Sequence, residues 1–149
     1  MTAELVVRKS AGFAWQTPFS RRELERILRA MRTACAFDDV PLDVTLADDA
    51  FISEANAAYL ACPGPTNILS FPPYGGLGPG LGTTPGAGIM LLSLDAVNRE
   101  ALLYGQDTAE HTLRLFAHGM AHLTGLDHSP EMEVLEEKIL AAGKAACAR

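Results

Sequence analysis

Three histidines stand close together near the C-terminal end of this chain, at His118, His122 and His128. Residues four positions apart lie on one face of a helix, so His118 and His122 are able to present ring nitrogens to the same ion. Gly125 allows the chain to leave that helix through a left-handed turn, which predicts that His128 comes back to the first two. Three histidines with a fourth position open to water are typical of catalytic zinc sites, whereas structural zinc sites usually include cysteines. The spacing therefore predicts bound Zn²⁺ or another divalent transition metal.

The fourth histidine of the chain, His111, has a different expected role. It lies on the same predicted helical face but seven residues before His118, which is roughly 10 Å along the helix axis. That separation is too large for His111 to share the ion. We expect it at the surface or in a second layer around the site.

The residue after the first histidine separates this site from the proteases with similar spacing. Metzincin proteases carry the pattern H-E-x-x-H-x-x-G-x-x-H, in which the glutamate is the general base. Gly119 occupies the glutamate position here. A protease of that class without its base should lose most of its activity. The pattern predicts a metal centre without the usual peptidase chemistry.

A second motif, Pro-Thr-Asn-Ile-Leu-Ser-Phe-Pro at residues 65–72, precedes the histidine segment. Together and in this order, the two motifs resemble those of the YbeY family of metal-dependent endoribonucleases, bacterial factors for ribosomal RNA maturation and quality control. The resemblance implies a zincin-like α/β fold and a single-stranded RNA substrate. Two positions differ from the usual family pattern. Leu60 follows Tyr59 where the family usually has arginine, and residues 86–90 lack the usual aspartate.

The resemblance also suggests residues beside the metal. Asp127 is adjacent to the third histidine, and we expect it either to accept a hydrogen bond from water or from a ligand's free N–H, or to be a polar turn residue. Asn67 and Ser70 correspond to the family's substrate-side motif. Strand alternation predicts that only one of them faces the cleft unless a bulge intervenes. Phe71 is expected in the core, with stacking on an unpaired base as the alternative.

The hydrophobic and capping patterns predict an α/β fold of the mixed α+β kind, with a small four-stranded mixed sheet and about five helices. The glycine- and proline-rich residues 72–86 predict a mobile surface loop, which is either a flexible linker or a lid or substrate-guiding loop beside the site. We expect one domain over residues 1–149. The expected strands cover residues 4–8, 42–47, 66–71 and 89–94, and the expected helices cover 20–37, 48–60, 95–104, 107–124 and 129–146.

Charge is unevenly distributed along a chain whose net charge is −6. Residues 1–37 carry seven Lys and Arg against three acidic residues, and the remainder carries five against fifteen. Arg22, Arg26 and Arg29 share one face of the first predicted helix. This face is either a patch that follows RNA phosphates or an ordinary solvated helix surface.

The location expected from the sequence is the cytoplasm. No apolar run reaches the about 18 residues that a membrane span requires, and the N-terminus lacks a signal-peptide core. The cysteines are odd in number and far apart, which is typical of reduced thiols.

The function predicted from these features is a single-strand-specific, metal-dependent endoribonuclease in ribosomal RNA maturation and ribosome quality control. Single-stranded or ribosomal RNA is the expected partner, with ribosomal subunit proteins as further candidates and without DNA or membrane. Two alternatives stay open. One is a zinc hydrolase of peptides or of small esters and amides, and the other is a metal-stabilised ribosome-assembly factor that binds RNA but barely cuts it.

Overall fold

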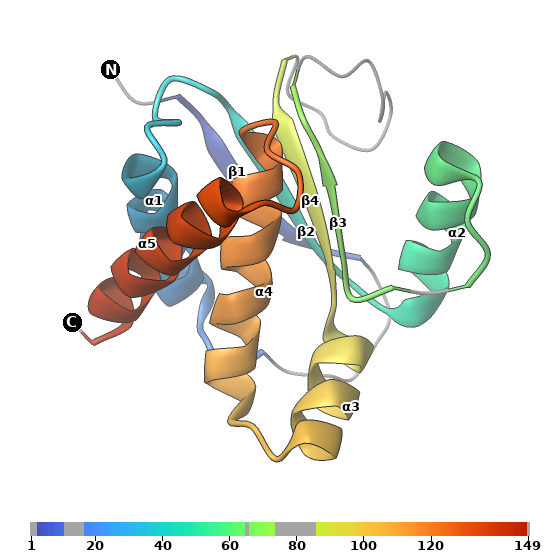
Figure 1. Ribbon diagram of the computed structural model, residues 1–149. Coiled ribbons are helices and arrows are strands. Elements are labelled where there is room, and N and C mark those ends of the chain that lie inside the picture. The colour runs from blue at the N-terminus through green and yellow to red at the C-terminus, as the bar shows by residue number, and fades with distance from the viewer. Residues whose placement is uncertain (1–2, 11–16, 65, 74–85, 149) are drawn as a thin grey trace.

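The computed structural model describes residues 3–10, 17–64, 66–73 and 86–148. In these residues four strands form one mixed sheet in the order β1-β2-β4-β3, with β3 antiparallel to β4 and the other pairs parallel. The described residues also form five helices, of which α1 to α4 contact the sheet and α5 packs on α1 and α4 (Figure 1). The predicted α/β class is therefore confirmed. The elements in chain order are β1 (Leu5–Lys9), α1 (Arg21–Ala34), β2 (Leu42–Ala47), α2 (Asp49–Leu60), β3 (Ile68–Phe71), β4 (Gly88–Ser93), α3 (Leu94–Tyr104), α4 (Thr108–Leu123) and α5 (Pro130–Cys147).

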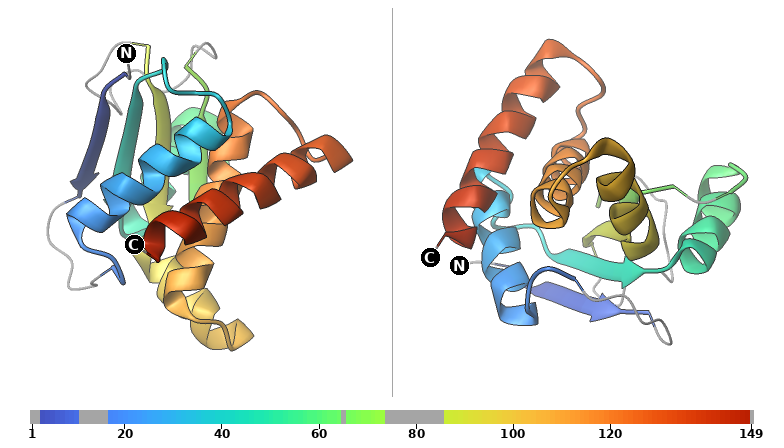
Figure 2. Two further views of the ribbon diagram at one scale, coloured as in Figure 1. Left: turned by 90° about the vertical axis from the view of Figure 1, so that its left-hand side faces the viewer. Right: turned by 90° about the horizontal axis from the view of Figure 1, so that it is seen from below.

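The central strand β4 is buried on both faces, and its side chains alternate between two apolar clusters. Met90 and Leu92 belong to the larger cluster, which includes residues of α1, α3, α4 and α5. Ile89 and Leu91 belong to the smaller cluster, which they form with residues of α2 and β3. Helix α4 contacts β3 and β4, while α5 packs across α4 and α1 as an outer layer (Figure 2). This arrangement places α4 inside the fold.

Two element boundaries differ from the sequence-based prediction by two or more residues, for local reasons. Helix α1 ends at Ala34 because the N–H groups of Ala36 and Phe37 donate to the carbonyls of Thr33 and Arg32, with Ala36 at φ 58°. This closing turn usually has glycine at the left-handed position, so an alanine gives no sequence signal for it. Strand β3 starts at Ile68, because the N–H of Ile68 donates to the side chain of Asn67.

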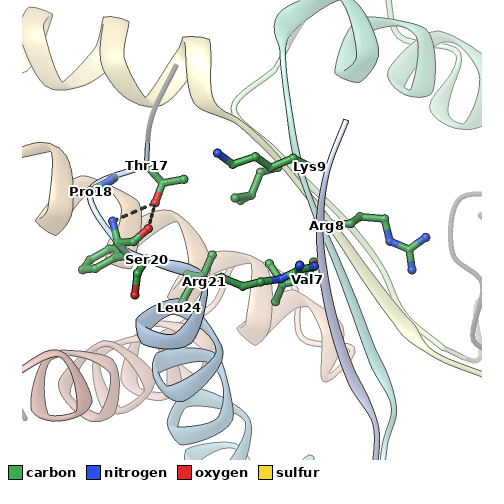
Figure 3. A pocket seen from close by; sticks show the side chains of 10 residues that line it. Val7, Arg8, Lys9, Thr17, Pro18, Ser20, Arg21 and Leu24 are labelled. Atoms are coloured by element: carbon green, nitrogen blue, oxygen red, sulfur yellow. Dashed lines mark hydrogen bonds between the residues drawn. The ribbon is translucent and has the colours of Figure 1, made fainter. Parts of the chain in front are cut away.

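Much of the positive charge near the N-terminus is used inside the fold. Arg32 is buried and donates to the carbonyls of three residues: Ala3, Glu4 and Val40. Arg8 pairs with the buried carboxylate of Asp43. In Figure 3 the side chain of Arg21 reaches from the start of α1 to β1, where it donates to the carbonyl of Val7. The basic character of residues 1–37 is thus partly structural.

The structure bears on two further sequence-based expectations. Residues 74–85, most of the predicted loop 72–86, lie outside the described residues. Among the described helices, none has the length and apolar character needed to cross a membrane.

Candidate metal centre

Helix α4 presents two of the three histidines because its packing face is fixed by the core. Phe116, Ala117, Met120 and Ala121 are fully buried, which leaves His118 and His122 half-buried on the adjacent face. The helix begins where the side chain of Asp107 accepts the N–H of Glu110. These contacts fix both the rotation and the start of α4.

The third histidine returns to the first two through a tight connection. Helix α4 is capped by Thr124, and Gly125 adopts φ 93°, a conformation that favours glycine. Ser129 caps α5 by accepting the N–H of Met132, with Pro130 as the first helical residue. His128 lies immediately before this cap. The histidine is therefore held between two well-defined helix ends.

The three imidazoles converge as the spacing predicts. One ring nitrogen from each of His118, His122 and His128 lies within 4.8 Å of the others. The Nε2 atoms of His118 and His122 are 3.2 Å apart. Nitrogens about 2.0–2.1 Å from a tetrahedral zinc lie roughly 3.3 Å from one another. The donor set and this separation fit a zinc ion, and the role of these residues as metal ligands stays a prediction.

His122 is electrostatically suited to bind a cation. Burial lowers the pKa of its imidazole, and the nearby rings of His118 and His128 lower it further. Only the neutral ring has a free lone pair for a metal. Because the pKa is lowered, the neutral form of His122 persists to lower pH than that of an ordinary histidine.

A carboxylate that the sequence analysis missed supports the first histidine. Glu136 of α5 lies with its two oxygens 3.2 and 3.3 Å from Nδ1 of His118. With Nε2 of His118 facing the other histidine, Nδ1 is the nitrogen left to donate to Glu136. Carboxylates in this position fix the tautomer and the orientation of metal-binding histidines. A sequence signal exists, because Glu136 interrupts the inward stripe of α5 formed by Met132, Ile139 and Gly143.

Replacing Glu136 by glutamine is expected to weaken zinc binding about tenfold to a hundredfold. The amide keeps the size of the side chain but removes the charge that stabilises the donating N–H of His118. Competition with a chromogenic chelator measures the affinity, and Glu137→Gln on the exposed side of α5 is the matched control. Equal affinities of both variants and the parent would show that Glu136 does not support the metal.

Gly119 is required by close packing between α4 and β3. A Cβ at this position would lie 2.7 Å from Cδ1 of Ile68, 2.9 Å from Oγ of Ser70 and 3.0 Å from Sδ of Met90. In addition, the hydroxyl of Ser70 donates to the carbonyl of Gly119 at 3.0 Å. A side chain at the position of the protease glutamate would therefore require these three neighbours to shift.

A cavity of about 450 Å³ opens beside the histidines. Its lining includes His118, His122, Asp127, Asn67 and Ser70. Both substrate-side candidates border the cavity, although strand alternation predicted only one, because Asn67 precedes the first residue of β3. Asp127 is exposed, and the carboxylate on the free nitrogen of His118 belongs to Glu136 instead.

The structure also shows where the side chains of Phe71 and His111 lie. Phe71 is 1% exposed and packs edge-to-face on Tyr59 at 5.9 Å between ring centroids. It is a core residue, so the stacking alternative is wrong. His111 is buried rather than at the surface, and its Nε2 lies 2.8 Å from Oε1 of Glu100.

The fold and this geometry match one known family. The family model described as Endoribonuclease YbeY matches residues 11–144. The chain belongs to the YbeY family. An Endoribonuclease YbeY from Nitratidesulfovibrio vulgaris is 42% identical, and 91% of each chain is covered. Another from Oleidesulfovibrio alaskensis is 36% identical and 95% of each chain is covered.

A solved structure shares the fold. The solution structure of TM1509 from Thermotoga maritima matches with a TM-score of 0.62 over 94% of this chain and 89% of that chain. The two sequences are 20% identical. At that level of identity the likeness shows the common fold alone.

The structure does not bring the predicted arginines to the metal cavity of this YbeY chain. Arg22, Arg26 and Arg29 line a separate groove between α1 and the C-terminal part of α5. Arg26 donates from Nε to the carbonyl of Ala146 at 3.1 Å. Ala146 is ten residues after Glu136, which corresponds to roughly 15 Å along α5. A contact of this groove with RNA stays a prediction.

Proposed function

We propose that this chain is a metal-dependent endoribonuclease that cuts single-stranded RNA during ribosomal RNA maturation and ribosome quality control. The observation that carries the proposal is the convergence of three imidazole nitrogens within 4.8 Å beside an open cavity, in a chain of the YbeY family. The relatives named above are endoribonucleases by name. We place the reaction in the cytoplasm, with ribosomal RNA as substrate and ribosomal subunit proteins as further candidate partners.

The residues of the site divide the work between metal and substrate. His118, His122 and His128 would hold the ion, and Glu136 keeps the proton of His118 on Nδ1 so that Nε2 is free. When bound, Zn²⁺ would polarise a phosphate oxygen and lower the pKa of a coordinated water to about 7. Asp127 lies at the cavity and is our candidate to orient that water by accepting a hydrogen bond. Asn67 and Ser70 form the wall against which the phosphodiester would lie.

Two observations bear on the alternatives. The close packing at Gly119 disfavours a peptide hydrolase of the metzincin type, because no general base fits there. A weakly active ribosome-assembly factor remains the second candidate. It is favoured by Leu60 at the end of α2, because this position exposes an apolar side chain where the family usually has arginine.

The positive charge on α1 bears on where the RNA backbone would lie outside the cavity. Arg22 and Arg29 are exposed on one face of α1, and with Arg26 they border the groove beside α5. We propose that this groove attracts the RNA backbone at a distance from the metal. Each phosphate contact to a single strand adds about 0.7 to the salt slope of binding.

RNA cleavage should depend on metal, whereas peptides should stay intact. We expect the zinc-loaded protein to cut a labelled, unstructured RNA, EDTA to stop the cleavage, and added Zn²⁺ to restore it. Casein serves as the competing substrate in the same buffer. Casein cleavage that depends on His118 would favour the peptide-hydrolase alternative. Tight RNA binding without metal-dependent cleavage would favour the assembly factor.

A further inference from the structure

A chain of hydrogen bonds joins the cavity wall to the interior of the protein. Asn67 lines the metal cavity, and its Nδ2 lies 3.3 and 3.5 Å from the two carboxylate oxygens of Glu100 on α3. Glu100 in turn lies 2.8 Å from Nε2 of His111 on α4. These hydrogen bonds therefore link Asn67, directly before β3, to α3 and to α4, the helix that carries His118 and His122.

Hydrogen bonds hold both the side chain and the backbone of Asn67. Its Oδ1 accepts the backbone N–H of Ile68 at 2.7 Å, and its backbone carbonyl accepts the N–H of Ser93 at 2.9 Å. If the amide flipped, Ile68 would face an NH₂ group and Glu100 would face a carbonyl oxygen, so both hydrogen bonds would be lost. Nδ2 carries two hydrogens, and Glu100 accepts one of them.

The carboxylate of Glu100 accepts a hydrogen bond from each of its two neighbours. An ionised carboxylate only accepts hydrogen bonds, so it accepts from the amide of Asn67 and from the Nε2–H of His111 at the same time. His111 is buried, and its Nδ1 finds no hydrogen-bond partner within the described part of the chain. The ring is thus held through Glu100. The adjacent Arg99 is directed elsewhere, to Asp49 at 3.0 Å.

We propose that Glu100 and His111 are positioning residues that hold the Asn67 amide as a fixed N–H donor for a phosphate oxygen of the RNA. The second hydrogen of Nδ2 is the donor, offered from the wall of the cavity that His118 and His122 also line. The inference rests on the proposed function, because it assigns the contact to the RNA substrate of the same site. It predicts an effect on RNA binding and cleavage without an effect on zinc content.

A double variant that exchanges the amide of Asn67 and the carboxylate of Glu100 distinguishes the positioning role from a purely structural role. In Asn67→Asp/Glu100→Gln, the aspartate accepts from Ile68 and from the glutamine amide, while the glutamine oxygen accepts from His111. The double variant keeps the number of hydrogen bonds and the net charge, but it removes the N–H donor from the cavity wall. Asn67→Asp alone places two carboxylates against each other, and Glu54→Gln on the exposed side of α2 is the control.

The zinc-loaded full-length variants are compared by melting temperature, zinc content, and kcat and KM on a labelled oligouridylate. Asn67→Asp should melt several degrees lower, and the double variant should return to the melting temperature of the parent. Its kcat/KM should stay roughly tenfold to a hundredfold below the parent, which is the range expected for a lost hydrogen bond to a charged group. His111→Leu should lower kcat/KM by a smaller factor, and His111→Gln, which keeps an N–H donor, should keep kcat/KM near that of the parent.

Binding of the same oligouridylate in EDTA, followed by fluorescence anisotropy, gives a readout that does not depend on cleavage. A double variant that binds at least several-fold more weakly than the parent supports the proposal. A double variant that melts, binds and cuts like the parent overturns it, while the proposed function stands. If the parent itself does not cut RNA, the proposed function fails, and the anisotropy comparison alone decides the role of Asn67.

Discussion

Replacing His122 by alanine is expected to reduce RNA cleavage by about a thousandfold or more. Outer partners of metal ligands typically contribute 10- to 100-fold to affinity or activity, and a direct ligand should contribute more than that. The ring centroid of His122 lies 4.6 Å from that of His118 and 5.3 Å from that of His128. Its removal leaves two imidazoles, which are too few to hold a tetrahedral ion tightly at low metal concentration.

The measurement combines the initial cleavage rate with zinc content after dialysis. His111→Gln is the matched control for zinc content, because it changes a histidine on the same helix that lies outside the cluster. We expect the control to keep one zinc per chain and His122→Ala to lose it. If His122→Ala retains both zinc and cleavage, His122 is not a ligand.

Introducing glutamate at position 119 is expected to unfold the site rather than to create a peptidase. The added Cβ alone meets three side chains of β3 and β4 at 2.7 to 3.0 Å. Overpacking of this kind costs about 1–3 kcal/mol, and an uncompensated buried carboxylate costs several kcal/mol more. Because domains are typically stable by about 5–15 kcal/mol, we expect the melting temperature of Gly119→Glu to fall by more than about 10 °C.

Thermal denaturation of the metal-free protein tests this expectation without interference from bound zinc. Gly143→Ala in α5 is the comparison, since its new methyl would meet a single flexible side chain, that of Met31, rather than three. We expect a smaller loss of stability there than for Gly119→Ala. A Gly119→Glu variant with the melting temperature of the parent, and with casein cleavage, would refute the packing argument for this position.

The metal cluster could be predicted from the sequence because it depends on local geometry. His118 and His122 are one helical turn apart, and Gly125 and Pro130 mark the ends of the two helices that hold His128. Helix and strand order followed from apolar periodicity and from capping residues. The exact end of α1 could not be predicted, since an alanine takes the left-handed position usually filled by glycine.

The partners of the cluster depend on tertiary contacts, which the sequence does not reveal. Glu136 reaches His118 only because α5 folds back over α4. Glu100 meets His111 and Asn67 across three elements. The sequence also does not show that part of the positive charge in residues 1–37 is structural, because Arg32, Arg8 and Arg21 bind carbonyls or a carboxylate of the protein itself. Contacts of this kind come from packing and have no fixed spacing along the chain.

Titration of zinc into the metal-free protein tests the central claim, that the three histidines hold the ion that enables RNA cleavage. Bound zinc and the initial rate of cleavage of an unstructured RNA are measured on the same samples. We expect the rate to rise in proportion to bound zinc and to stop rising at one zinc per chain, with no rise in His122→Ala. Cleavage that persists in the metal-free protein, or that rises equally in the variant, would contradict the claim.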